Sequence, residues 1–339
     1  MVKPHRDFGL NGGQQAGDAP PAGWLITLLR WFDNEAGVLP DDESHRQVDW
    51  LRTIPFIAMH LACLTVFWVG VSPVAVAVAL GLYLLRMFAI TGFYHRYFSH
   101  KAFRTSRPVQ FLFALVGAAA VQRGPLWWAS HHRHHHIHSD DPEDVHSPRQ
   151  QGFLWSHMGW FLCRVHFRTR VELVRDWLKF PELRFLDRYD VIVPIGLAVG
   201  MFGLGELLES FQPAWGTNGL QMLVWGFVIS TIVLYHATFT VNSLAHVWGR
   251  RRYATRDDSR NNAFLALITL GEGWHNNHHH YPASARQGFY WWELDATYLV
   301  LRLMALLHIV WDLKPLPAAF RDTRRSVTVP AAAEGESAR

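Results

Sequence analysis

Histidine is the residue type that points most directly to chemistry in this sequence. The chain has 21 histidines in 339 residues, and many of them lie in three short motifs. The first motif is H-R-Y-F-S-H, with His95 and His100, the second is H-R-H-H-H, from His132 to His136, and the third is G-E-G-W-H-N-N-H-H, which ends at His279. Neutral imidazole is a common ligand of iron, zinc, copper and nickel. The motifs therefore predict a metal site.

The second and third motifs share one spacing. Offsets of three and four residues place three rings of the second motif along one helical face: His132, His135 and His136. His134 points elsewhere. The third motif repeats these offsets with His275, His278 and His279. A repeated H-x-x-H-H in two distant segments predicts two sets of ligands that meet in space, which suits two metals better than one.

Two further pairs extend the set of candidate ligands. His95 and His100 are five residues apart, a spacing that does not share an α-helical face well, so we expect the helix to end or bend between them. Asn242 and His246 are four residues apart and share a face where an apolar span ends. Nine histidines are too many for one tetrahedral zinc ion, which needs four ligands. The candidates are His95, His100, His132, His135, His136, Asn242, His246, His275, His278 and His279.

A different di-iron plan also has matching residues. Ferritin-like bundles use Glu-x-x-His motifs, and here Glu143 precedes His146 and Glu272 precedes His275 at that spacing. Both motifs lie in Gly-, Pro- or Asp-rich surroundings rather than in long bundle helices, and this plan leaves the histidine triples unused. We expect Glu272 instead to orient a ligand imidazole.

Four apolar segments are long enough to cross a hydrocarbon core, which takes about 20 helical residues. They are paired by short connections, the first of which is Ser72-Pro73, and therefore predict two transmembrane hairpins: Ile54–Val71 with Val74–Tyr94, and Val191–Leu208 with Leu220–Phe239. The expected fold class is an all-α integral membrane protein with four transmembrane helices and a cytoplasmic helical cap.

Basic residues predict the orientation, because Lys and Arg in short flanking segments stay on the cytoplasmic side. The segment Phe93–Asp190 holds 14 of the 32 Lys and Arg, the region after His246 holds 12, and Gly203–Leu220 holds none. We therefore expect a multi-pass protein of the cell membrane with both termini and both polar regions in the cytoplasm. Arg86, the one basic residue inside a span, is expected to extend to the cytoplasmic interface.

Shorter segments complete the organisation. Three of them are apolar but unsuited to crossing the bilayer and predict helices that lie on it: Trp24–Phe32, Pro108–Val121 and Tyr298–Val310. We divide the chain into an N-terminal tail with one such helix, a membrane domain and a disordered C-terminal tail, at residues 1–50, 51–320 and 321–339. The two cysteines have no metal-type spacing, and a structural disulfide is not expected.

Over about Leu80–Ser284 the sequence resembles the membrane acyl-CoA desaturases of the stearoyl-CoA delta-9 type. H-R-Y-F-S-H, H-R-x-H-H, N-S-x-A-H and G-E-G-W-H-N-N-H-H occur in that family's order, and the stretch D-P-E-D-V-H-S-P-R-Q-Q-G-F-L-W-S-H-M-G-W resembles its cytoplasmic segment. The resemblance implies a di-iron centre (two Fe²⁺ ions) held in the cap by the nine histidines named above, with Asn242 acting through a bound water.

The resemblance also implies a reaction, the O₂-dependent insertion of a cis double bond at delta-9 of a saturated fatty acyl chain carried by CoA. Animal members of the family hold the CoA phosphates with an Arg-Lys pair, for which this chain has Arg164-Val165. Arg164 is the expected substrate contact, and the missing Lys leaves a lipid-linked acyl chain as an alternative. The other expected partners are the lipid bilayer and an external electron-transfer protein (ferredoxin, rubredoxin, cytochrome b5 or a reductase). Nucleic acid is not among them.

Two other functions stay open. A membrane hydroxylase would use the same histidine motifs and the same oxidant, and only its product would differ. A metal transporter would need ligand residues midway along the spans, where the sequence offers His60 and His236. The lining of an acyl tunnel is not evident from the sequence, and the aromatic candidates are Trp127, Trp128, Trp274, Trp291 and Trp292.

Overall fold

The computed structural model describes residues 29–36 and 47–323. The predicted helix Trp24–Phe32 and the two predicted tails lie largely outside these residues, so they stay predictions. Within the described part, four helices are long and apolar enough to cross a membrane: Trp50–Val69, Pro73–Ser99, Ile192–Phe211 and Gly219–Val247. The predicted fold class is confirmed.

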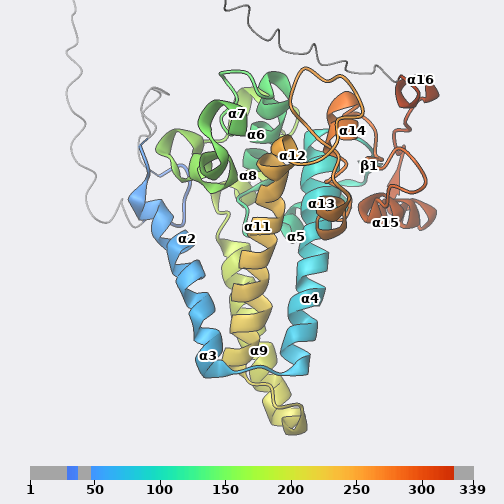
Figure 1. The fold of residues 1–339 in the computed structure, drawn as a ribbon. Coiled ribbons are helices and arrows are strands. Elements are labelled where there is room, and N and C mark those ends of the chain that lie inside the picture. Colours follow the sequence, from blue (N-terminus) through green and yellow to red (C-terminus); the bar gives the residue numbers. More distant parts are fainter. Residues whose placement is uncertain (1–28, 37–46, 324–339) are drawn as a thin grey trace, which may run out of the picture.

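Each span is built from one or more helical elements. The first contains α2 (Trp50–Ala62), a 3₁₀ turn (Cys63–Thr65) and α3 (Val66–Val69). The second is α4 (Pro73–Phe88) continued by a π-helix (Ala89–Ser99), and the third is α9 (Ile192–Phe211). The fourth contains α10 (Gly219–Met222), a π-helix (Leu223–Ile229), α11 (Ser230–Asn242) and α12 (Leu244–Val247). In Figure 1 the spans run lengthwise below a helical cap.

The loops at the far end of the spans tie the two hairpins together. The Ser72 hydroxyl accepts a hydrogen bond from the Ala75 amide, which starts α4, and it is also hydrogen-bonded to the Thr217 hydroxyl at 2.5 Å. Gln221 and Trp225 donate to the carbonyls of Val69 and Gly70 where the first span ends. The carbonyl groups left free at that helix end are thereby satisfied by the fourth span.

The cap holds most of the remaining elements, shown at the top of Figure 1. Its helices are α5 (Arg107–Ala118), α6 (Pro125–His138), α7 (Pro148–Gln151), α8 (Pro181–Arg188), α13 (Ala263–Ile268), α14 (His275–His280), α15 (Ala296–Leu306) and α16 (Ala318–Arg321). Single turns occur at Trp155–Gly159, Trp160–Leu162, Arg164–His166 and Val171–Leu173, and another lies in the far loop at Pro213–Trp215. A two-residue antiparallel pair joins β1 (Arg104–Thr105) to β2 (Val310–Trp311).

Helices α5 and α15 correspond to two of the predicted interfacial segments. Both are apolar and shorter than a span, and α15 exposes Leu299, Leu303 and Leu306. Their position on a bilayer stays a prediction. Cys63 and Cys163 are not joined in a disulfide.

The prediction that Arg86 extends to the interface is wrong. Its side chain is 1% exposed and donates hydrogen bonds to the hydroxyls of Ser230 and Thr231 on α11, at 2.5 and 2.7 Å. It also donates to the carbonyl of Leu82. The neighbouring span supplies enough acceptors for the guanidinium group, so it does not need to reach water.

Candidate metal centre

The helix carrying the first motif ends at Ser99, between His95 and His100, as predicted. The last part of this helix, Ala89–Ser99, is a π-helix. The His100 amide donates a hydrogen bond to the carbonyl of His95, five residues earlier. Because a π-helix closes its hydrogen bonds over five residues, this spacing brings the two rings together, with centroids 4.8 Å apart.

Helix α6 presents the second motif. It starts with Pro125 after Gly124, and the amides of Leu126 and Trp127 donate to the carboxylate of Asp187 from α8, at 3.0 and 2.7 Å. This carboxylate satisfies amides that every helix N-terminus leaves without an intrahelical partner. A Cβ atom on Gly124 would lie 2.4 Å from Asp187, so the close approach requires glycine.

Helix α14 presents the third motif and is fixed through the two asparagines between its histidines. Asn276 accepts hydrogen bonds from the amides of Arg252 and Tyr253, both at 2.7 Å. Asn277 donates to the Gln287 carbonyl and to Glu293, both at 2.9 Å. Both asparagines are fully buried, so a helix of only six residues is held rigidly.

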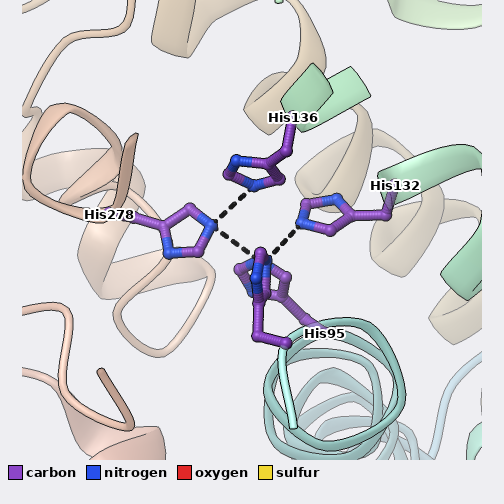
Figure 2. Close-up of side chains that lie close together, drawn as sticks. His95, His132, His136 and His278 are labelled. Carbon is purple, nitrogen blue, oxygen red and sulfur yellow. Dashed lines mark hydrogen bonds between the residues drawn. The ribbon is translucent and has the colours of Figure 1, made fainter. Parts of the chain in front are cut away.

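Five of the predicted ligands form one cluster, which we call the five-histidine group: His95, His100, His132, His136 and His278. Each contributes a ring nitrogen, and these nitrogens lie within 4.8 Å of one another. The Nε2 atom of His278 is 3.0 Å from that of His95 and 2.9 Å from that of His136. In Figure 2 the labelled rings of this group point toward a common centre.

The other four predicted histidines form the four-histidine group: His135, His246, His275 and His279. The Nε2 atoms of His246 and His275 are 3.1 Å apart. Each H-x-x-H-H motif is therefore divided between the two groups, although its rings had been expected to face one point. Rings at successive positions, such as His135 and His136, diverge enough to serve neighbouring centres.

Carboxylates lie behind four of these rings. His135, His246 and His279 place Nδ1 at 3.0, 2.9 and 2.7 Å from Asp144, Asp140 and Asp257 respectively. His95 places Nδ1 2.5 Å from Glu272, the residue expected to orient an imidazole. An ionised carboxylate only accepts, so Nδ1 carries the proton and the Nε2 lone pair is turned inward. Several inward lone pairs within a few ångströms repel one another unless a cation lies between them, so this donor set fits metal ions.

The electrostatics favour neutral imidazole rings, the form that binds metals. Burial, followed by the neighbouring histidines, holds the pKa values of His132, His136 and His278 well below the usual range. His135 differs: burial lowers its pKa, but the charge and hydrogen bond of Asp144, together with the charges of Asp140 and Asp257, give a net rise. Asp144 and Asp257 are also buried, yet the facing histidines lower their pKa values, so both stay ionised.

Sequence reasoning missed three of these carboxylates. Asp140 and Asp144 lie in the acidic run that follows the second motif, and Asp257 lies in a charged loop far along the chain. The available signal was that Asp140 and Asp144 follow the second histidine motif within eight residues. The ferritin-like plan is not supported, because Glu143 is exposed and Glu272 contacts His95 rather than acting with His275.

The other predicted site residues lie apart from the two groups. Asn242 ends α11 and borders a small cavity of about 40 Å³ together with His135 and His275. Its contact to a metal through water stays a prediction. Arg164 is exposed at the start of a short 3₁₀ turn and does not line the larger cavity described next.

The larger cavity has a volume of about 260 Å³, and two of the predicted site residues, His132 and Asn242, line it. Trp127 and Trp128 line it, as the sequence suggested, beside Phe56, Phe161 and other apolar side chains. The remaining tryptophan candidates line neither cavity. Trp291 and Trp292 are 87% and 55% exposed, and Trp274 donates to the Leu294 carbonyl.

The two midspan histidines bind each other rather than the metal candidates. His60 on α2 and His236 on α11 place their Nε2 atoms 3.2 Å apart. His236 also contacts His157, which in turn is 2.9 Å from the Ser243 hydroxyl. Among the described residues, these three histidines form no group with the spacing of a metal site.

The comparisons with known proteins agree with this geometry. A family model described as fatty acid desaturase matches residues 45–311, which is most of the chain. The chain belongs to the fatty acid desaturase family. This desaturase is 38% identical over 258 residues to the chloroplastic palmitoyl-monogalactosyldiacylglycerol delta-7 desaturase of Arabidopsis thaliana, covering 75% of this chain and 66% of that protein. It therefore spans just under two thirds of that relative.

Two other relatives widen the range of substrates. The desaturase is 35% identical over 271 residues to the sn-1 stearoyl-lipid 9-desaturase of Anabaena variabilis, covering 79% of this chain and 94% of that protein. It is 33% identical over 299 residues to the acyl-CoA C20 Delta5-desaturase of Anemone leveillei, covering 81% of this chain and 88% of that protein. The fatty acid desaturase family is confirmed, but the acyl-CoA delta-9 type is not, because the relatives differ in acyl carrier and in double-bond position.

Proposed function

We propose that this desaturase inserts a cis double bond into a saturated fatty acyl chain, using O₂ and two iron ions held by the two histidine groups. The observation that supports the proposal is the gathering of nine buried or partly buried imidazoles, from four separate segments, into two adjacent groups. The proposed ligands of the two irons are the nine histidines, and Asn242 contacts a metal through a water molecule. The family membership supports the same activity.

The chemistry requires a strong oxidant, because no acid or base deprotonates a methylene in the middle of a saturated chain. A di-iron centre, when bound, supplies that oxidant from O₂. The overall reaction joins O₂, two electrons, two protons and a –CH₂–CH₂– unit to give –CH=CH– and two water molecules. The electrons come from a separate electron-transfer protein.

The chain's own residues position the substrate. The larger cavity offers aromatic and apolar walls from Phe56, Trp127 and Phe161, and it ends beside His132. Burying an acyl chain against such walls is favourable by about 0.8 kcal/mol per methylene. Trp128, His132 and Asn242 border both cavities, so the part of an acyl chain that reaches these residues would lie next to both histidine groups.

The double-bond position, the acyl carrier and the membrane orientation are proposed from the sequence and its relatives. The motif resemblance and the sn-1 stearoyl-lipid 9-desaturase relative favour the delta-9 position. We propose CoA or a membrane lipid as the acyl carrier, with Arg164 as a contact if the carrier is CoA. The distribution of Lys and Arg favours cytoplasmic termini in the cell membrane.

Expression in a host with a simple saturated lipid profile tests the function. Mass-spectrometric mapping of double bonds should find new cis double bonds at carbon 9, in cells that hold the protein and not in cells that hold the empty vector. A hydroxylated product would favour the membrane hydroxylase instead. Iron should be present in the purified protein at two ions per chain, and protein without redox-active metal would contradict the proposal.

A further inference from the structure

A buried arginine whose guanidinium group has no hydrogen-bond partner among the described residues lines the larger cavity. Arg52 lies in the first turns of α2 and is 8% exposed. Among the residues that the structure describes, none accepts a hydrogen bond from its Nε, Nη1 or Nη2 atoms. Leaving a buried charge unpaired costs several kcal/mol, so a guanidinium group in this state indicates a missing anionic partner.

The neighbouring charges do not supply that partner. Arg30 is paired with Asp49 at 2.6 Å, and Arg123 is paired with Asp190 at 2.9 Å. These two pairs are neutral, and both arginines line the same cavity as Arg52. Arg52 thus holds the uncompensated positive charge of this cluster.

The Arg52 guanidinium is held in place by an aromatic ring. It lies over Phe167, 4.8 Å from the ring centroid, and Arg123 lies over the same ring at 4.9 Å. A guanidinium stacked in this way keeps its donor edge free for planar recognition of an oxyanion. The position is therefore preorganised even though no acceptor is present.

The cavity connects this charge to the histidines. Arg52, Phe56, Trp128 and His132 border one continuous space of about 260 Å³. One molecule can therefore contact His132 with its acyl chain and Arg52 with its polar group. The arrangement separates a charged end from an apolar path, which matches an acyl chain esterified to an anionic carrier.

We infer that Arg52, supported by Arg30 and Arg123, binds a phosphate group of the acyl carrier. Phosphate oxygens accept strong charge-assisted hydrogen bonds from a guanidinium fork. The inference rests on the proposed function, because it names the carrier class of the same substrate. The phosphate belongs either to a glycerophospholipid or to CoA, and a neutral galactolipid lacks it.

The test uses the full metal-loaded protein in detergent, without turnover. Binding is measured by native mass spectrometry, and the thermal unfolding midpoint by tryptophan fluorescence, with dipalmitoyl phosphatidylglycerol, palmitoyl-CoA, dipalmitoyl monogalactosyldiacylglycerol and palmitate as probes. The variants are Arg52→Gln, Arg52→Lys and the control Arg104→Gln, whose side chain is exposed and pairs with Asp312.

The expected result has two parts. Arg52→Gln should weaken binding of a phosphate carrier by about tenfold or more, with partial recovery in Arg52→Lys and no change in Arg104→Gln. Without any probe, Arg52→Gln should unfold at the same temperature as the parent protein or higher, because it removes an unpaired buried charge. Dependence on Arg52 with phosphatidylglycerol alone identifies a lipid source, and dependence with palmitoyl-CoA alone identifies CoA.

Three results would overturn the inference. Arg52→Gln could bind both phosphate carriers as tightly as the parent protein, or it could lose as much affinity for the galactolipid or palmitate as for them. A lower unfolding temperature without probe would show that Arg52 has a structural partner within the chain. Intact binding without double-bond formation would count against the proposed function alone, so the two failures are distinguishable.

Discussion

The two histidine groups differ in what lies behind their rings. In the four-histidine group, Asp140, Asp144 and Asp257 each contact the Nδ1 atom of one ring. In the five-histidine group, Glu272 is the carboxylate that contacts a ring, at His95. Carboxylates behind imidazoles make the rings more basic and compensate the charge of a cation. The two proposed iron positions are therefore electrostatically unequal, although their ligands are of one type.

The largest expected effect comes from removing one ligand in either group. His278→Ala breaks the five-histidine group and His135→Ala breaks the four-histidine group, and each should abolish the unsaturated product, since both irons are needed. Product is measured by mass spectrometry of host lipids, and iron by elemental analysis of the purified protein. Both variants should still reach the membrane. Retained activity in either one would count heavily against that group as a metal site.

A smaller effect is expected from the carboxylates, and it should separate the groups. Asp257→Asn should weaken iron binding at the four-histidine group by about 10- to 100-fold and leave the other iron in place. Titration of iron into chelator-treated protein measures this directly. The matched control is Asp258→Asn, since this neighbouring side chain contacts Arg149 and Arg251 rather than a histidine. An equal loss of iron affinity in both variants would show that the effect does not depend on the contact between Asp257 and the His279 ring.

A still smaller effect is expected at Asn242, which lines the small cavity together with His135 and His275 of the four-histidine group. Asn242→Ala removes one hydrogen bond to the proposed water, worth about 0.5–1.5 kcal/mol, so turnover should fall by at most about tenfold. The measurement is the rate of product formation with both irons present. A complete loss of iron would instead make Asn242 a direct ligand.

The smallest effect is expected from the polar residues of the motifs that lie outside both groups. His134 stacks on His138, and Glu143 is exposed. His134→Ala and Glu143→Gln should change the free energy of unfolding by no more than about 0.5 kcal/mol and leave activity within twofold. A large loss of activity in Glu143→Gln would revive the ferritin-like plan.

The sequence predicted the spans and the gathering of the histidines well because both leave local patterns. Apolar length identified all four spans, yet the predicted ends at Tyr94 and Phe239 fell short of the observed ends at Ser99 and Val247. Many of the missing residues are polar, and His95, Arg96, Ser99, Ser243 and His246 among them are buried within the protein. The π-helix at His95 could not be foreseen, because it depends on long-range packing that overrides the α-helical spacing.

The features that sequence reasoning missed are assembled from distant segments. Asp140 and His246 are 106 positions apart, and their contact appears only after the fourth span folds against the cap. The arginines that line the cavity, at positions 30, 52 and 123, lie in three unrelated segments. Charged residues in such loops usually face solvent, so neither set stands out from its sequence context.

Arg86 has a consequence for how the protein is made. Its hydroxyl partners, Ser230 and Thr231, are 144 and 145 positions further along the chain. When the first hairpin enters the bilayer during synthesis, those partners have not yet been translated, and an arginine within a span costs about 2.5–3.5 kcal/mol during insertion. We therefore expect the first hairpin to stay in a partly hydrated or tilted state until the second hairpin arrives. Biogenesis of this protein thus ends with a docking step between two separately inserted halves.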